Sequence, residues 1–237
     1  MWSLYIVCLV SFNYQVVFGK LPDVIKKCHK SSENINECIC ESIELLRTNL
    51  ATGDFGENFT MPALEPLFID EIKIRRENNF NEFVFRNLFV SGPSDFVLKN
   101  MAADVDNKTF RFDLELPFLE FKGDYTIALK LLVKISGNGK FKGAFKNSLA
   151  KVVAIGQPVN ADGITEFKLS VKLKVDYAFF HMESLLLSSF GNRLINDNYK
   201  LFLDELVPGL EESLSRIFAD IVNTILKDST YEEMFPE

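Results

Sequence analysis

Residues 199–227 have the sequence YKLFLDELVPGLEESLSRIFADIVNTILK. Apolar residues recur there every three or four positions, so they share one face of an α-helix roughly 40 Å long. An isolated amphipathic helix is only marginally stable in water, so this one needs a large apolar surface to pack against. Pro208 is expected to kink the helix, or to end a first helix near Val207. The apolar face consists of Phe202, Leu203, Leu206, Leu210, Leu214, Ile217, Phe218, Ile221 and Ile225.

The middle of the chain supplies that surface as strands, because apolar residues alternate with polar ones. Several alternating runs exceed ten residues, and long antiparallel strands with one apolar face must curl or stack. We therefore predict an α+β fold, a long and strongly curved antiparallel sheet wrapped around the C-terminal helix. An all-β sandwich is the competing fold, but it leaves the helix without a packing surface. The main inward residues are Phe83, Phe85, Phe89, Phe110, Phe112, Leu114, Leu116, Tyr125, Ile127, Leu129, Leu131, Phe167, Leu169, Val171, Leu173, Val175 and Tyr177.

Glycines indicate where these strands turn. Gly137-Asn138-Gly139 is a hairpin signal between two alternating runs. Gly123-Asp124 and Asp162-Gly163 predict two more turns.

The first 19 residues, MWSLYIVCLVSFNYQVVFG, contain no charged side chain and end in a Val-Phe-Gly sequence. This pattern predicts a secretory signal peptide over residues 1–19, cleaved before Lys20. A membrane anchor is the alternative, but Asn13, Tyr14 and Gln15 interrupt the apolar run. Residues 20–237 are then a single secreted, extracellular domain.

Three cysteines remain after such a cleavage, Cys28, Cys38 and Cys40. An odd number predicts one disulfide and one free thiol. We favour the pair Cys28–Cys38, with Cys28–Cys40 as the alternative. The bridge would staple a helix that opens at Leu21-Pro22-Asp23 to a second amphipathic helix, on which Ile39, Ile43, Leu46 and Leu50 share a face.

Two tripeptides, at Asn58 and Asn107, match the acceptor pattern for N-glycosylation. They fit a secreted glycoprotein.

The chain has few residues suited to catalysis. There is no Gly-x-Ser-x-Gly motif and no phosphate-binding glycine loop, and His29 and His181 are the only histidines. We expect no enzymatic activity, no catalytic residue, no metal site and no cofactor. The net charge of −7 leaves no basic face for nucleic acid or for anionic membranes, and no stable membrane insertion is expected.

Several short motifs occur in a characteristic order along the mature chain: Leu21-Pro22, Asn36 shortly before Cys38, Leu64-Glu65-Pro66-Leu67, Gly123-Asp124-Tyr125, Gly137-Asn138-Gly139-Lys140, Leu206-Val207-Pro208 and Met234-Phe235-Pro236. In this order they resemble the insect Takeout and haemolymph juvenile-hormone-binding protein family. The resemblance implies a long C-terminal helix wrapped by a curved sheet, with a tunnel for long apolar ligands such as terpenoid hormones or fatty-acid-like lipids. The position of Cys38 within it favours the Cys28–Cys38 bridge. Hormone carriers of the family tend to have a second, later disulfide, and the absence of any cysteine after Cys40 favours the Takeout-like branch.

We therefore predict a monomeric secreted carrier that binds a small hydrophobic ligand. The sequence does not identify a receptor for it. The alternative is an extracellular protein-interaction or lipid-surface recognition module without a transported ligand. Tyr125 and Tyr177 are the candidates for orienting the ligand, because each hydroxyl needs a partner on an inward face. The candidate tunnel-lining residues are Phe83, Phe85, Phe89, Phe110, Phe112, Tyr125, Ile127, Leu129, Leu131, Leu173, Tyr177, Leu214 and Phe218.

Overall fold

The computed structural model describes residues 21–56, 61–75, 81–130, 134–161, 164–182, 197–227 and 229–237. For residues 129–130, 135, 159–161, 164–182 and 199 it describes the backbone only. The predicted signal peptide and the Asn58 sequon lie outside these ranges. The helices are α1 (Ile35–Leu45), α2 (Arg47–Thr52), the 3-10 helix η1 (Pro93–Asp95), α4 (Tyr199–Ile225) and α5 (Tyr231–Met234).

The strands of the described chain form one six-stranded antiparallel sheet in the order β1-β2-β4-β5-β6, with β3 also paired to β4. One edge of β4 carries both neighbours, because β3 pairs with its first half and β2 with its second half. The strands are β1 (Leu67–Arg75), β2 (Glu82–Ser91), β3 (Val97–Asp104), β4 (Thr109–Lys130), β5 (Lys134–Ala161) and β6 (Ile164–Met182).

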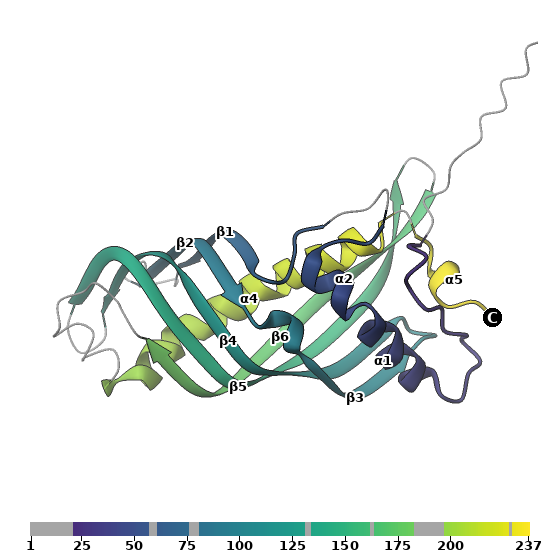
Figure 1. Ribbon diagram of the computed structural model, residues 1–237, viewed down its shortest axis with the longest axis horizontal. Coiled ribbons are helices and arrows are strands. Elements are labelled where there is room, and N and C mark those ends of the chain that lie inside the picture. The colour runs from purple at the N-terminus through teal and green to yellow at the C-terminus, as the bar shows by residue number, and fades with distance from the viewer. Residues whose placement is uncertain are drawn as a thin grey trace, which may run out of the picture.

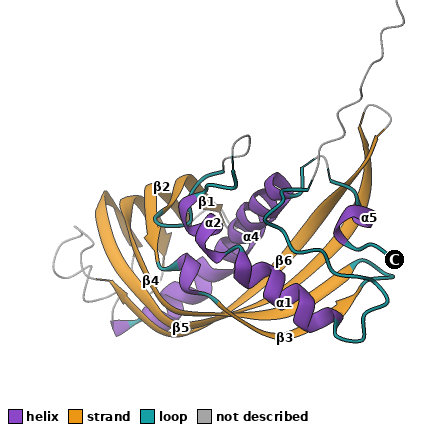
Figure 2. Ribbon diagram, turned by 45° about the vertical axis from the view of Figure 1, so that its right-hand side comes forward, coloured by secondary structure: helices purple, strands orange, loops and turns teal. Residues whose placement is uncertain are grey.

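The sheet curves around α4, which runs along the length of the molecule (Figures 1 and 2). The helix packs against β6 and β1, the first and last strands of the sheet order, which do not pair with each other within the described ranges, so the sheet is rolled but not closed. The predicted α+β fold, a curved sheet around the C-terminal helix, is thereby confirmed. Pro208 lies inside α4, which continues through it for its full 27 residues rather than ending near Val207.

The hairpin predicted at Gly137-Asn138-Gly139 is wrong. These residues lie within β5, where Gly139 is paired with Tyr125 and Gly137 with Ile127 of β4. Because a glycine has no side chain, each leaves space beside the large residue opposite. Gly123-Asp124 likewise lies inside β4 rather than at a turn. β5 and β6 are paired up to Ala161 and Ile164, and the predicted turn at Asp162-Gly163 itself lies outside the described residues.

The longest strands reverse their inward and outward faces once along their length. In β5, Phe141 and Phe145 face inward, whereas further along the strand Ser148, Ala150 and Val152 do. The change falls at Asn147, whose φ of 52° is in the left-handed region that asparagine tolerates. The neighbouring strand β4 changes its inward face at the same level. Its pairing with β5 continues from Leu116↔Ser148 to Phe118↔Lys146, and directly paired residues lie on the same face of the sheet.

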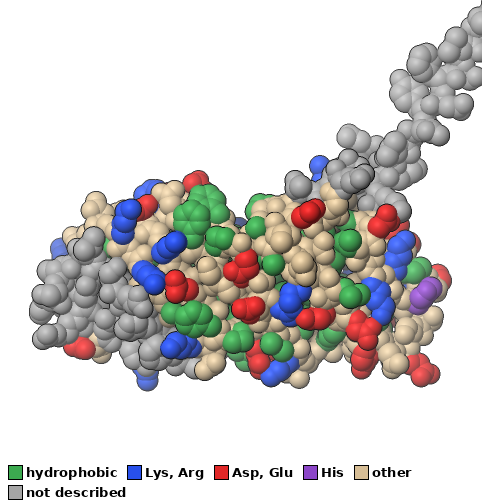
Figure 3. Space-filling model, in the orientation of Figure 1, with side chains coloured by type: hydrophobic (Ala, Val, Ile, Leu, Met, Phe, Trp, Pro, Cys, Tyr) green, Lys and Arg blue, Asp and Glu red, His purple; other side chains and the backbone are tan. Residues whose placement is uncertain are grey.

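Oppositely charged side chains are paired across the outer face of the sheet, and acidic and basic groups are interspersed on the surface shown in Figure 3. Arg86 contacts Glu71 at 2.8 Å and Lys99 contacts Glu115 at 2.7 Å. These pairs are exposed, so each contributes little to stability.

The contact between α4 and β1 depends on a residue without a side chain. A Cβ added at Gly209 would lie 2.3 Å from Cγ2 of Ile74, which is itself buried. Gly→Ala inside a helix ordinarily stabilises by about 1 kcal/mol, but overpacking costs about 1–3 kcal/mol. We therefore expect Gly209→Ala to lower the free energy of unfolding, measured by urea denaturation. In a double-mutant cycle, Ile74→Ala should relieve the effect; additive losses would contradict the close contact.

Candidate functional site

A cavity of about 460 Å³ lies between the inner face of the sheet, α4 and the N-terminal helices. This volume is in the range of ligand-binding pockets. The lining side chains that the structure describes are apolar except for those of Ser42 and Ser148, and none of these described side chains is charged. Such a surface can hold an apolar molecule but offers no counter-charge to an ion.

The cavity is elongated. Its lining follows α4 from Leu206 to Ile225, a length of about 30 Å at the helical rise per residue. The same face of α4 was identified from the sequence, and Leu210, Leu214 and Phe218 contribute to the lining.

Small side chains on β5 explain why this space stays open. Ser148, Ala150 and Ala154 point inward and are buried, and all three line the cavity. Large lining residues such as Phe112 and Phe218 belong to β4 and α4. The inner surface therefore has large side chains on β4 and α4 and small side chains on β5.

The N-terminal helices cover one side of the cavity, with Ile39 and Ile43 of α1 and Leu50 of α2 in the lining. Polar contacts fix this cover to β3 and to the residue just before it. The side-chain oxygen of Asn36 accepts a hydrogen bond of 2.8 Å from the Ala103 amide of β3. The Arg47 guanidinium of α2 donates to the Phe96 carbonyl at 2.7 Å and lies over the Phe96 ring, 4.3 Å from its centre.

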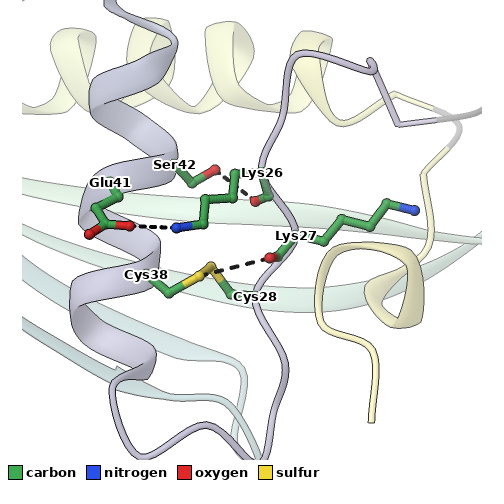
Figure 4. A network of polar contacts seen from close by, with 6 residues as sticks. All are labelled: Lys26, Lys27, Cys28, Cys38, Glu41 and Ser42. Atoms are coloured by element: carbon green, nitrogen blue, oxygen red, sulfur yellow. Dashed lines mark hydrogen bonds and ion pairs between the residues drawn. A yellow bond between two sulfur atoms is a disulfide. The ribbon is translucent and has the colours of Figure 1, made fainter.

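The predicted disulfide between Cys28 and Cys38 is present, and Cys40 is free. It joins the segment before α1 to α1 itself (Figure 4). The described chain has no helix at the predicted Leu21-Pro22-Asp23 start; residues 21–34 form turns and irregular structure. Beside the bridge, Lys26 is paired with Glu41, and the Ser42 hydroxyl donates to the Lys26 carbonyl at 2.9 Å.

The C-terminal residues close the end of the cavity that lies beside the disulfide-linked segment, and Met234 and Phe235 are part of the lining there. The Lys30 amide donates to the Pro236 carbonyl at 2.9 Å, which holds the tail against the disulfide-linked segment. The Tyr231 hydroxyl donates to the Val105 carbonyl. Burial, reinforced by Asp106, Glu232 and Asp104, raises the pKa of Tyr231 to about 12, so this hydroxyl keeps its proton.

The structure divides the predicted lining residues into four groups. Five lie along the cavity, namely Phe85, Phe110, Phe112, Leu214 and Phe218. Three others, Phe83, Tyr125 and Ile127, are at most 2% exposed and pack in the core cluster with Phe202 and Leu203. Phe89 lies at the surface. The side chains of the remaining four are outside the described part of the chain: Leu129, Leu131, Leu173 and Tyr177.

The placement of Phe89 is a correction with a clear cause. The pairing of β2 with β4 shifts between Arg86 and Phe89, and Asn87 has a φ of 49°. This bulge turns Leu88 inward and Phe89 outward, where Phe89 is 38% exposed and its ring centre lies 5.0 Å from that of Phe68.

Tyr125 lies away from the cavity lining, edge-on to Phe141 with 6.2 Å between ring centres. Its hydroxyl has no hydrogen-bond partner among the described residues, and burial raises its pKa. Its expected role in orienting a ligand is therefore not supported by its position. Asn107, the described sequon, is exposed between β3 and β4, and its side chain donates to Asp104 at 2.9 Å.

Sequence reasoning missed the contributions of the N-terminal helices, of the C-terminal Met234 and Phe235, and of Ser148. The apolar face of α1 and α2 was recognised, but nothing in the pattern linked it to a cavity. Ser148 was missed because its inward direction depends on the change of face at Asn147.

Among the described residues, no three His, Cys, Asp or Glu side chains are placed to share a metal ion. Within the same ranges, no helix has the length and apolar character needed to span a membrane.

The fold of this chain is similar to that of solved structures. The crystal structure of Epiphyas postvittana Takeout 1 matches with a TM-score of 0.65 and 20% identity, covering 90% of this chain and 100% of that one. A lipopolysaccharide-binding protein matches with a TM-score of 0.36 and 14% identity, covering 79% of this chain and 37% of that one. No curated protein matches in sequence. The family model described as haemolymph juvenile hormone binding protein (JHBP) matches residues 4–236, so the chain belongs to the JHBP family.

Proposed function

We propose that this protein is a secreted carrier that holds a small hydrophobic ligand, a terpenoid hormone or a long-chain lipid, in an internal apolar tunnel. The observation that carries the proposal is the elongated cavity along α4, where no described lining side chain is charged. The JHBP family suggests the same hydrophobic cargo.

Burial would supply the affinity, at roughly 25 cal/mol per Å² of apolar surface before the costs of ordering and association. A long chain matches the cavity better than a compact molecule, because the lining follows about 30 Å of α4.

Two features support secretion. The Cys28–Cys38 disulfide is typical of an oxidising compartment, and Asn107 lies exposed where a glycan could be attached. Together with the predicted signal peptide, they favour an extracellular protein with Lys20 at its mature N-terminus.

The test is a titration with the neutral dye N-phenyl-1-naphthylamine, which fluoresces in apolar surroundings. We expect about one site per chain and an affinity that hardly changes between 0.05 and 1 M salt, because burial and not charge drives the binding. Lysozyme of equal concentration serves as a control without such a site. Absence of dye binding, with no lipid extractable from the purified protein, would favour an interaction module instead.

A further inference from the structure

The hydroxyl of Ser148 is a polar group without a partner in an apolar cavity. The residue is 4% exposed and lines the cavity from β5. Among the residues that the structure describes, its Oγ makes no hydrogen bond. Leaving a buried hydroxyl unpaired costs about 1–3 kcal/mol, so such a group needs an explanation.

The inward direction of Ser148 is built into the strand. Phe145 faces the cavity, and simple alternation would place Asn147 inward and Ser148 outward in solvent. The left-handed backbone at Asn147, with its φ of 52°, reverses this order. The backbone thus directs a hydroxyl into the cavity at the level where β4 also changes face, opposite Leu116.

None of the other lining side chains that the structure describes is available to pair with this hydroxyl. The other serine in the lining, Ser42, already donates to the Lys26 carbonyl at 2.9 Å. A buried water is held by two to four polar partners, and the rest of the described lining side chains are apolar. The missing partner is therefore expected to arrive with the ligand.

The position of Ser148 constrains where the ligand carries its polar atom. On β5 the lining runs from Phe141 to Ala154, with Ser148 near its middle. At the rise of a strand, about 20 Å of apolar wall lies on either side of the hydroxyl. An oxygen at Ser148 would therefore have an apolar arm on each side.

We infer that Ser148 is the polar anchor of the site, and that it selects ligands carrying a neutral oxygen, such as a ketone, ester or ether, between two apolar arms. This inference rests on the proposed carrier function. Ionised fatty acids are disfavoured at this position, because the described part of the lining holds no cation to balance a buried carboxylate.

The experiment compares 7-tridecanone, tridecane and tridecanoate as competitors of N-phenyl-1-naphthylamine, in the full-length secreted protein and in Ser148→Ala. The substitution should lower the affinity for 7-tridecanone by about tenfold, since it leaves the ketone oxygen unpaired. It should change the affinity for tridecane by less than about twofold. The wild type should bind tridecanoate more weakly than the ketone at pH 8. Ser148→Thr, which keeps the hydroxyl, should restore the preference for the ketone, and Ser136→Ala, at an exposed serine of the same strand, should leave both affinities unchanged.

A stability measurement separates an anchor from a structural hydroxyl. Without ligand, Ser148→Ala should melt at the same temperature as the wild type or higher, because it removes an unpaired buried group. A lower melting temperature of the variant, or equal losses of affinity for 7-tridecanone and tridecane, would overturn the anchoring role of Ser148. The proposed carrier function would be unaffected by either result. If the wild type bound neither the dye nor any competitor, both the carrier and the anchor would be refuted.

Discussion

Ala150→Phe is expected to weaken the binding of an apolar probe by tenfold or more while leaving the protein at least as stable as the wild type. Ala150 is 4% exposed and lines the cavity from the middle of β5. A phenyl ring there would occupy space that the ligand needs, and displacing roughly 60 Å² of buried apolar ligand surface already costs about tenfold in affinity. Dye titration gives the affinity, and thermal unfolding without ligand gives the stability.

The adjacent residue supplies a matched control. Leu149 points to the opposite face of β5, so Leu149→Phe should change neither dye affinity nor the cavity. If the cavity were instead a packed core, Ala150→Phe would destabilise the protein by about 1–3 kcal/mol, as overpacking does. That result, with unchanged probe affinity, would remove the basis of the proposed function.

Patterns within single elements were sufficient to predict the fold. The helical spacing of Leu206, Leu210 and Leu214 predicted α4, and the long alternations predicted a curved sheet that needs such a helix. The family resemblance and the odd cysteine count indicated the Cys28–Cys38 bridge. Each of these predictions depends on spacing along the chain, which the sequence displays directly.

The site was harder to predict, because two local backbone events decide which side chains face it. The bulge after Arg86 moved Phe89 to the surface, and the change of face at Asn147 brought Ser148 inside. Alternation alone cannot locate such events, since each of them reverses every position beyond it. An asparagine inside each strand, Asn87 and Asn147, was one available signal, as asparagine tolerates positive φ.

Whether an inward residue lines a cavity or fills a core depends on distant parts of the chain. Phe83 and Phe85 lie on one face of β2, yet Phe83 packs edge-on against Phe202 while Phe85 borders the cavity. The difference follows from α4 and from the small residues of β5, which are far away in sequence.

Removing the disulfide is expected to have the largest effect on stability. The double variant Cys28→Ser/Cys38→Ser should lower the free energy of unfolding by about 2–4 kcal/mol, because the unfolded chain loses the constraint of a closed loop. For a domain of this size the midpoint of thermal unfolding should fall by about 5–15 °C. Thermal and urea unfolding of the oxidised wild type and the variant provide the comparison.

The same variant should also release ligand faster. The bridge holds the segment before α1, which carries Ile25 into the lining and pairs with the C-terminal tail through Lys30 and Pro236. Loosening that segment frees the end wall formed with Met234 and Phe235, so the dissociation rate of the dye in stopped-flow measurements should rise more than its association rate. Cys40→Ser removes the free thiol, whose pKa is raised by burial, and should leave stability and dissociation unchanged. An unaltered dissociation rate in the double variant would show that ligand leaves the cavity by a route away from the disulfide-linked end.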